Sequence, residues 1–374
     1  MPTHFALITG RDLRGLRGRA ALPDAATWRS LARNAWRVSL VVVGLVLVAV
    51  ATLAGVKAWS INQAFDSQIT RIPDAVPAGP ALPPVRGTES VPAQNLLLLG
   101  TDLPGALDQS LNQLGAQNLL SVLVVHFAAD RRSVQVVAVP RDVLLGPARD
   151  ADEAGDATDE GVPFEEANAT LGSTLTAGGV PSVVDAVEDY FRVKLDRVGV
   201  FQLSALELLT DAVGGVTVQN PVPFTASGHS FSRGSQELDG AEVLTFVSER
   251  NALVDGELQR IQNQNILLRA LLLSLSDSDK LTNLRLLGEL LAAVTPQLAA
   301  DDGLTVGYLG GLGLELADLR EDVHFLAVPA VPVAAAVPAA AEATGVESAY
   351  EIPTQDLAAL RQAFQTDDFA RFEG

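Results

Sequence analysis

The chain of 374 residues contains no cysteine, so no disulfide stabilises it and no thiolate chemistry is available to it. Its four histidines are far apart and show no zinc-ligand spacing; they are His4, His126, His229 and His324. His126 lies inside an apolar run, which favours a plain strand position. Because no disulfide is available, stability must come from a hydrophobic core, which a domain of roughly 280 residues can supply.

Positive charge is scarce over most of the chain. The whole sequence has 26 basic and 45 acidic residues, and residues 1–37 hold seven of the former and two of the latter. The remainder therefore has 19 basic and 43 acidic residues, a formal charge of −24. Because the phosphates of nucleic acids require a basic surface, this balance disfavours nucleic acid as a partner.

One long uncharged apolar run is present, at residues 38–56. A transmembrane helix needs about 20 such residues, whereas a buried core helix would show a polar face and a cleaved signal a shorter apolar core. Seven arginines precede the run and only Lys57 follows it closely, while Trp36 and Trp59 flank it. Since positive charge stays in the cytoplasm, we expect a single-pass protein of the cell membrane with an extracellular main domain.

The sequence divides into five expected parts. Residues 1–37 are a cytoplasmic tail, 38–56 the membrane span, 57–92 a Pro/Ala-rich spacer, 93–365 the extracellular domain and 366–374 a C-terminal tail. Within the domain, the acidic segment 146–166 is interpreted as a solvated loop rather than a cation site.

Strands and helices are expected to alternate, which indicates an α/β or α+β fold. Apolar runs of strand length, two of them joined by a hairpin at residues 129–132, occur at 96–99, 121–127, 134–139, 216–218 and 323–328. Apolar stripes with helical spacing occur at residues 181–191, 204–213, 237–247, 259–275 and 356–364, with further helical runs to about residue 299.

Five segments, in this order, together resemble the LytR-CpsA-Psr family of cell-envelope proteins. They are Asn95 to Asp102 (NLLLLGTD), Val139 to Val143 (VPRDV), Ala167 to Ala169 with Gly178 and Gly179, Asp211 to Val216 (DAVGGV), and Leu238 to Leu244 (LDGAEVL) before the arginines of 250–264. The resemblance covers residues 94–275 clearly and 276–365 more loosely. It implies a central mixed sheet between helices, with an apolar channel for a lipid tail.

The resemblance also implies a reaction and a set of site residues. Such proteins look like phosphotransferases that move a glycopolymer from a polyprenyl-pyrophosphate carrier onto peptidoglycan, with Mg²⁺ as cofactor. Asp102, Arg141 and Arg250 match the catalytic positions, with Asp102 also offering a carboxylate to the metal. Arg141, Arg250, Arg260 and Gln264 match positions that bind the pyrophosphate, for which the planar guanidinium fork is suited. Asp142 is expected to orient Arg141 rather than to touch the substrate.

The sequence departs from the family pattern at several of these positions. Asn118 and Leu120 stand where the family has an arginine and a second metal carboxylate, and Glu166, Ser248 and Asn263 replace cationic residues. Glu257 stands where an aspartate is typical. An alternative function is therefore a catalytically weak or inactive paralogue that binds polyprenyl lipid or envelope partners. Without the resemblance, Arg250 and Arg260 are consistent with surface charges and Asp102 with a turn residue.

Overall fold

The computed structural model describes residues 63, 65–73, 75–76, 92–103, 107, 111–146, 169–275, 284–319, 322–333 and 349–372. All of them belong to one compact unit, residues 61–374. The predicted tail 1–37, the predicted span 38–56 and nearly all of the acidic segment 146–166 lie outside the described residues. No helix within the described ranges combines the length and apolarity needed to cross a membrane.

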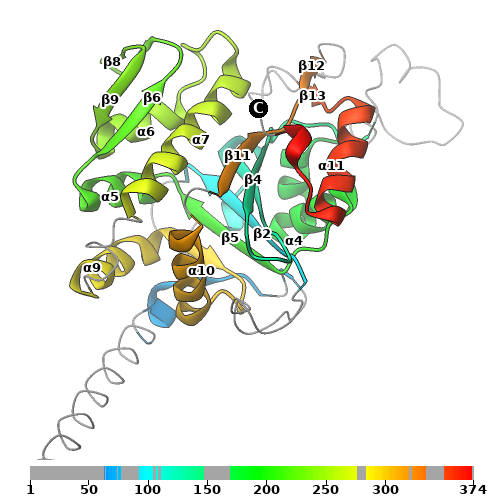
Figure 1. Cartoon of the computed structure of the whole chain (residues 1–374), viewed down its shortest axis with the longest axis horizontal. Helices are drawn as coiled ribbons and strands as arrows, with labels where there is room; N and C mark the ends of the chain where they lie inside the picture. The colour runs from blue at the N-terminus through cyan, green and yellow to red at the C-terminus, as the bar shows by residue number, and fades with distance from the viewer. Residues whose placement is uncertain are drawn as a thin grey trace, which may run out of the picture. The chain divides into compact units, whose positions relative to one another are not determined.

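A mixed sheet of seven strands forms the centre of this unit (Figure 1). Its order is β1 (Thr70–Arg71), β10 (Leu298–Ala300), β5 (Arg197–Gln202), β2 (Gln94–Thr101), β3 (Leu119–Phe127), β4 (Val134–Val139) and β11 (Val323–Ala327). Strand β3 is antiparallel to both β2 and β4, and β5 is parallel to β2. Consequently β2, β4 and β5 all end at the edge of the sheet where β3 begins.

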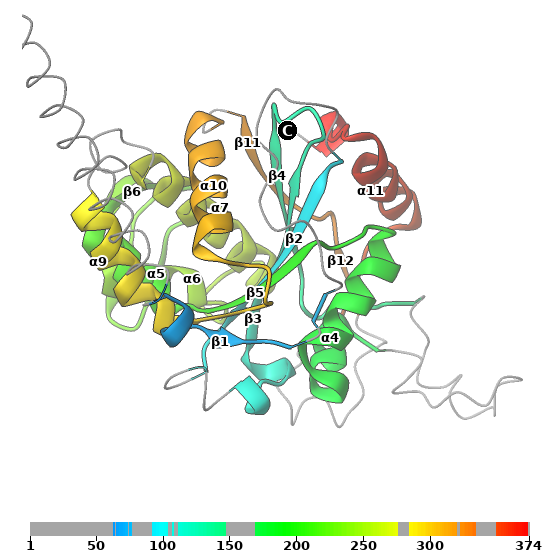
Figure 2. The same cartoon turned by 90° about the horizontal axis from the view of Figure 1, so that it is seen from below.

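Both faces of the sheet are buried, as the continuous apolar runs predict. Alternate residues of β2 and β3, such as Leu97 and Val124, join a cluster with α4 (Leu171–Phe191) and α11 (Thr354–Thr366). Their neighbours, such as Leu96 and Leu123, pack with α10 (Val306–Asp318). Figure 2 shows α4 and α11 on one side of the sheet and α10 on the other.

Beside the sheet lies a helical layer with its own apolar cluster, to which helices α5, α6 and α7 and two short ribbons contribute. In chain order, the elements of this part are α5 (Ser204–Val213), β6 (Val216–Asn220), β7 (Phe224–Ala226), β8 (His229–Phe231), β9 (Gly234–Leu238), α6 (Gly240–Ser248), α7 (Gly256–Leu275) and α9 (Leu284–Val294). The remaining elements are η2 (Leu111–Gln113), η3 (Ala116–Asn118), η5 (Thr295–Gln297), β12 (Val331–Val333), β13 (Ala349–Glu351) and η8 (Ala370–Phe372). Leu120 at the start of β3 joins the same cluster, which connects this layer to the sheet.

The predicted elements agree with the structure best where the periodicity is strong. The strand at 134–139 and the helix at 204–213 have the predicted bounds, and β3 and β4 form the predicted hairpin. The helix expected at 181–191 begins ten residues earlier, with the backbone broken at Gly179, where φ is 72°. The helix expected from residue 237 begins at Gly240, because Leu238 ends a strand and Asp239 caps the helix. The helical run expected to about residue 299 ends earlier, because 298–300 form β10.

Both ends of the folded unit differ from the predicted boundaries. Residues 65–76 were expected to be spacer, yet β1 extends the sheet and Phe65 and Ile72 are buried in its clusters. Residues 366–374 were expected to be tail, yet Asp367 accepts a hydrogen bond from the backbone nitrogen of Ala129 at 2.9 Å. The same carboxylate lies 2.9 Å from Nε2 of His126, which is fully buried. Both segments bury apolar side chains, such as Phe65, Ile72 and Phe369, and therefore belong to the folded unit.

Candidate functional site

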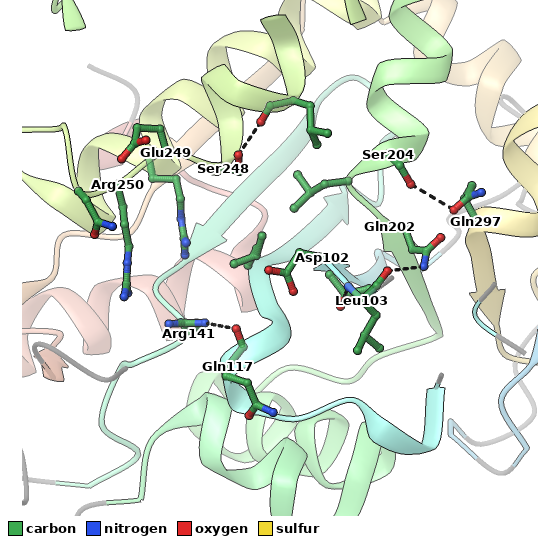
Figure 3. A pocket seen from close by; sticks show the side chains of 16 residues that line it. Asp102, Leu103, Gln117, Arg141, Gln202, Ser204, Ser248, Glu249, Arg250 and Gln297 are labelled. Atoms are coloured by element: carbon green, nitrogen blue, oxygen red, sulfur yellow. Dashed lines mark hydrogen bonds between the residues drawn. The ribbon is translucent and has the colours of Figure 1, made fainter. Parts of the chain in front are cut away.

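A cavity of about 890 Å³ opens at the sheet edge where β2, β4 and β5 end (Figure 3). Asp102 reaches it from the end of β2, and Arg141 from the turn after β4. Arg250, in the connection between α6 and α7, and Arg260, on α7, also line it. Because strands of the same direction end at the same edge, residues more than a hundred positions apart meet there. Of the four residues that the resemblance assigns to pyrophosphate binding, the cavity thus brings together the three arginines but not Gln264.

Arg141 is held by the backbone around the start of β3. Its Nη1 donates to the carbonyl oxygens of Ala116, Gln117 and Leu119 at 3.0, 3.1 and 2.8 Å. Its Nε donates to Asp142 at 3.2 Å, as expected of an orienting carboxylate. Burial raises the pKa of Asp142, and Arg141 opposes that shift. With these bonds made, Nη2 is the part of the guanidinium left to meet a ligand.

Arg260 forms a buried ion pair one helical turn from its partner. Its side chain is 2% exposed, and Nη2 lies 2.6 Å from the carboxylate of Glu257. Burial raises the pKa of Glu257, while the neighbouring Arg260 opposes the shift. Burial likewise lowers the pKa of Arg260, and Glu257 opposes this. The positive charge that Arg260 brings to the cavity is thus already countered by its buried partner.

Arg250 is the most accessible of the three arginines, because it lies in the connection between α6 and α7 and is only half-buried. Gln264, in contrast, does not line the cavity. Its Nε2 donates to the carbonyl oxygens of Leu120 and Val247 at 3.3 and 3.2 Å. It therefore ties the start of β3 to the end of α6, and this geometry differs from the predicted contact with phosphate.

The substituted family positions also lie at or beneath the cavity. Leu120 lines it at 8% exposure, where the resemblance implies a metal carboxylate. Asn118 donates to Asp102 at 3.2 Å. The hydroxyl of Ser248 bonds to its own helix at Leu244, and Asn263 is fully buried against the carbonyl of Phe246. Glu166 lies outside the described residues.

These residues do not fit a magnesium site held by the protein. Magnesium takes oxygen ligands, and Leu120 offers none beside Asp102. Within the described ranges, no group of three or more acidic, histidine or cysteine side chains could hold a metal ion. Asp102 is thus a lone carboxylate at the position where the resemblance implies a pair.

Charge in the site is closely balanced. Arg141, Arg250 and Arg260 are matched by carboxylates in or beside the cavity, namely Asp102, Asp142, Glu249 and Glu257. The arrangement can bind a phosphate through oriented guanidinium groups, but it has no surplus of positive charge. The affinity of the site for a phosphate must therefore depend on the orientation of the guanidinium groups more than on the net charge of the site.

Sequence reasoning missed one side of the cavity. Gln202, Ser204 and Gln297 line it from the end of β5, the start of α5 and the end of η5. The strand at 197–202 was not predicted, since its apolar residues are interrupted by Gly199 and preceded by Arg197. The signal that could have revealed this side of the cavity is Gln202, a polar residue that ends a strand at the same edge of the sheet as Asp102.

Comparisons with known proteins agree with this architecture. A family model described as the LytR_cpsA_psr family matches residues 64–365. The cell wall biosynthesis protein LcpA of Corynebacterium glutamicum is 31% identical over 202 residues, covering 50% of this chain and 38% of that protein. The polyisoprenyl-teichoic acid–peptidoglycan teichoic acid transferase TagU of Oceanobacillus iheyensis is 27% identical over 200 residues, covering 53% and 56%. The matches thus span about half the length of these relatives or less.

A solved structure shows the same fold at low sequence identity. Protein gbs0355 of Streptococcus agalactiae superposes with a TM-score of 0.56 at 17% identity, covering 74% of this chain and 88% of that one. Fold and site therefore define a mixed-sheet α/β protein with an arginine-lined cavity at one edge of the sheet. The family match extends over most of the folded unit. The chain belongs to the LytR_cpsA_psr family.

Proposed function

We propose that this protein transfers a glycopolymer from a polyprenyl-pyrophosphate carrier to peptidoglycan at the outer surface of the cell membrane. The observation that carries the proposal is the meeting of Arg141, Arg250 and Arg260 in one cavity. A pyrophosphate concentrates negative charge, and guanidinium groups bind its oxygens in pairs without losing their own charge. The transferase activity in the name of the Oceanobacillus relative supports the reaction class.

Phosphoryl transfer depends mainly on position and on stabilising charge. Arg250 and the free edge of Arg141 bind the phosphate oxygens, while Arg260 borders the same space from α7. Bonds from Arg141 to three carbonyls hold the start of β3 in place beneath the substrate.

The predicted span at residues 38–56 belongs to the same proposal. It would keep the domain at the membrane, where both the lipid carrier and the wall lie within reach. The N-terminal tail would remain cytoplasmic, as the seven arginines before the span indicate.

A second function is favoured by two of the cavity's own residues. Leu120 and Ser248 line the cavity where the family pattern has a carboxylate and an arginine. A paralogue with little or no activity would still bind the lipid carrier or envelope partners. Binding of polyprenyl pyrophosphate without any transfer is the result that distinguishes this function from the first.

The test is a transfer assay with the purified chain, a lipid-linked glycopolymer and peptidoglycan. We expect Arg250→Ala to lower transfer by about 10- to 100-fold, since a charged hydrogen bond contributes about 1.5–3 kcal/mol. Arg269→Ala is the matched control, because that arginine is exposed on α7 and does not line the cavity. Equal activity of the Arg250 variant and the control would contradict the proposed site.

A further inference from the structure

A second cavity, of about 670 Å³, adjoins the arginine-lined cavity. Arg250 and Asn251, in the connection between α6 and α7, line both of them. On its other side the second cavity is bordered by β12 and β13, from which Pro332 and Tyr350 reach it. The chain therefore has a separate space next to the arginines that are proposed to bind phosphate.

Buried ion pairs connect the two cavities, and each pair has its arginine in the first cavity and its carboxylate in the second. Arg141 lines the first cavity, and its partner Asp142 lines the second. Arg260 and Glu257 divide in the same way. The exposed Asp255 adds a third carboxylate to the second cavity. The first cavity thus offers guanidinium groups to a ligand, whereas the second offers carboxylates.

These carboxylates favour an uncharged ligand that donates hydrogen bonds. They repel anions, so a second phosphate is disfavoured, and the neighbouring arginines already balance them, so an added cation gains little. Glu257 is 6% exposed and accepts from Arg260 through Oε1. Its Oε2 belongs to the same ion pair but accepts no hydrogen bond within the part of the chain that the structure describes. A lipid tail is disfavoured as well, because it would cover these carboxylates without giving them partners.

The wall opposite the α6–α7 connection is suited to a sugar ring. Tyr350 and Pro332 supply an aromatic and an aliphatic surface, against which the apolar face of such a ring can pack. Burial raises the pKa of Tyr350, and the carboxylates of Glu257 and Asp142 raise it further. Its hydroxyl therefore stays protonated at neutral pH and can both donate and accept hydrogen bonds.

We propose that the second cavity binds the acceptor of the transfer reaction, an uncharged sugar of the peptidoglycan glycan strand. The inference rests on the proposed function, which requires an acceptor hydroxyl beside the phosphate. The hydroxyl groups of a sugar can donate to Asp255 and Glu257, which need donors rather than acceptors. Because Arg250 lines both cavities, a ring bound here lies next to the phosphate that this arginine holds.

Sugars reach this protein both in the donor and in the acceptor, and the direction of the reaction favours the acceptor here. In phosphoryl transfer the attacking and the leaving oxygen lie roughly in line, on opposite sides of the phosphorus. The donor's leaving phosphate needs the guanidinium groups of the first cavity. The attacking hydroxyl must then approach from another side, and the second cavity adjoins the first at Arg250.

The test measures binding to the full chain by calorimetry with two probes. They are geranyl pyrophosphate and a peptidoglycan tetrasaccharide whose lactyl carboxylates are amidated, so that it carries no charge. We expect Asp255→Ala and Tyr350→Ala to weaken tetrasaccharide binding about tenfold, the loss of about 1.4 kcal/mol, and to leave the affinity for geranyl pyrophosphate unchanged. Asp255 is exposed, so its substitution leaves the fold intact even if Tyr350→Ala does not. Asp322→Ala is the matched control, because this aspartate is also exposed and lines neither cavity.

Saturating geranyl pyrophosphate should leave tetrasaccharide binding intact, because the two probes occupy different cavities. Mutual exclusion of the probes would place the sugar in the first cavity and overturn the acceptor site. Equal losses for both probes in Asp255→Ala, or no loss for either, would overturn it too. If the unmodified chain binds geranyl pyrophosphate but not the tetrasaccharide, the acceptor site alone fails. Failure to bind geranyl pyrophosphate would instead overturn the proposed function.

Discussion

Replacing Arg141 by lysine should destabilise the fold as well as weaken substrate binding. Lysine keeps the charge, but its single ammonium cannot reach the acceptors that the planar guanidinium serves. Arg141 donates to three carbonyl oxygens and to Asp142, and it is 5% exposed. The carbonyl of Leu119 is buried, so leaving it without a donor costs about 1–3 kcal/mol. The lost bond to the buried Asp142 adds about 1.5–3 kcal/mol.

The expected total is about 2.5–6 kcal/mol, since the carbonyls of Ala116 and Gln117 lie nearer to solvent and contribute little. With a urea dependence of about 3 kcal/mol per molar, the unfolding midpoint should fall by about 1–2 M. The control is Arg250→Lys at the same cavity, where the half-buried side chain should tolerate the change within about 0.5 kcal/mol. If Arg141→Lys unfolds at the wild-type urea concentration, the bonds to β3 are not structural and the reasoning is wrong.

Four further results are expected. Asn118→Arg with Leu120→Asp should raise magnesium-dependent transfer by about 10²-fold or more, because each restored charged contact contributes about 1.5–3 kcal/mol; strong activity of the unmodified chain in chelator would argue against a degenerate metal site. A chain shortened to begin at residue 93 should melt well below one that begins at residue 62, since burying β1 and its neighbours removes several apolar side chains from water; equal melting would mean that these residues are dispensable. Burial lowers the pKa of His126 below 6.5 although Asp367 opposes it, so the unfolded state binds the proton first. The contribution of His126 to the stability is therefore fully present above pH 6.5 and is lost as the pH falls through the folded pKa. His126→Gln should remove this pH dependence of the unfolding free energy in urea titrations at pH 4–7. A C-terminal reporter active only outside the cytoplasm should give signal, and silence beside a working cytoplasmic counterpart would overturn the topology.

Local sequence patterns were sufficient for the central elements of the fold. Strand β4 and helix α5 have the predicted bounds, because their apolar spacing matches the period of one type of element. The same patterns failed where a short segment is shaped by its neighbours. Residues 298–300 extend a helical pattern in sequence but pair with β5, and 70–71 are too short to signal a strand at all.

The candidate site divides in the same way. Asp102, Arg141, Arg250 and Arg260 could be named from the sequence, because they match motifs of the family that the chain resembles. Their availability could not be predicted. Which edge of a guanidinium stays free depends on carbonyls that fold beside it, as the three bonds of Arg141 show.

The sequence by itself determined that the chain has no cysteine, that its main domain is acidic, and that several positions of the family pattern have lost positive charge. What only the tertiary structure decided is the assignment of each side chain. Gln264 supports the backbone instead of lining the cavity, and Gln202, Ser204 and Gln297 line it without any motif. The physical reason is that hydrogen-bond partners and burial arise from contacts between segments distant in the chain. The sequence does not show which of these segments come into contact.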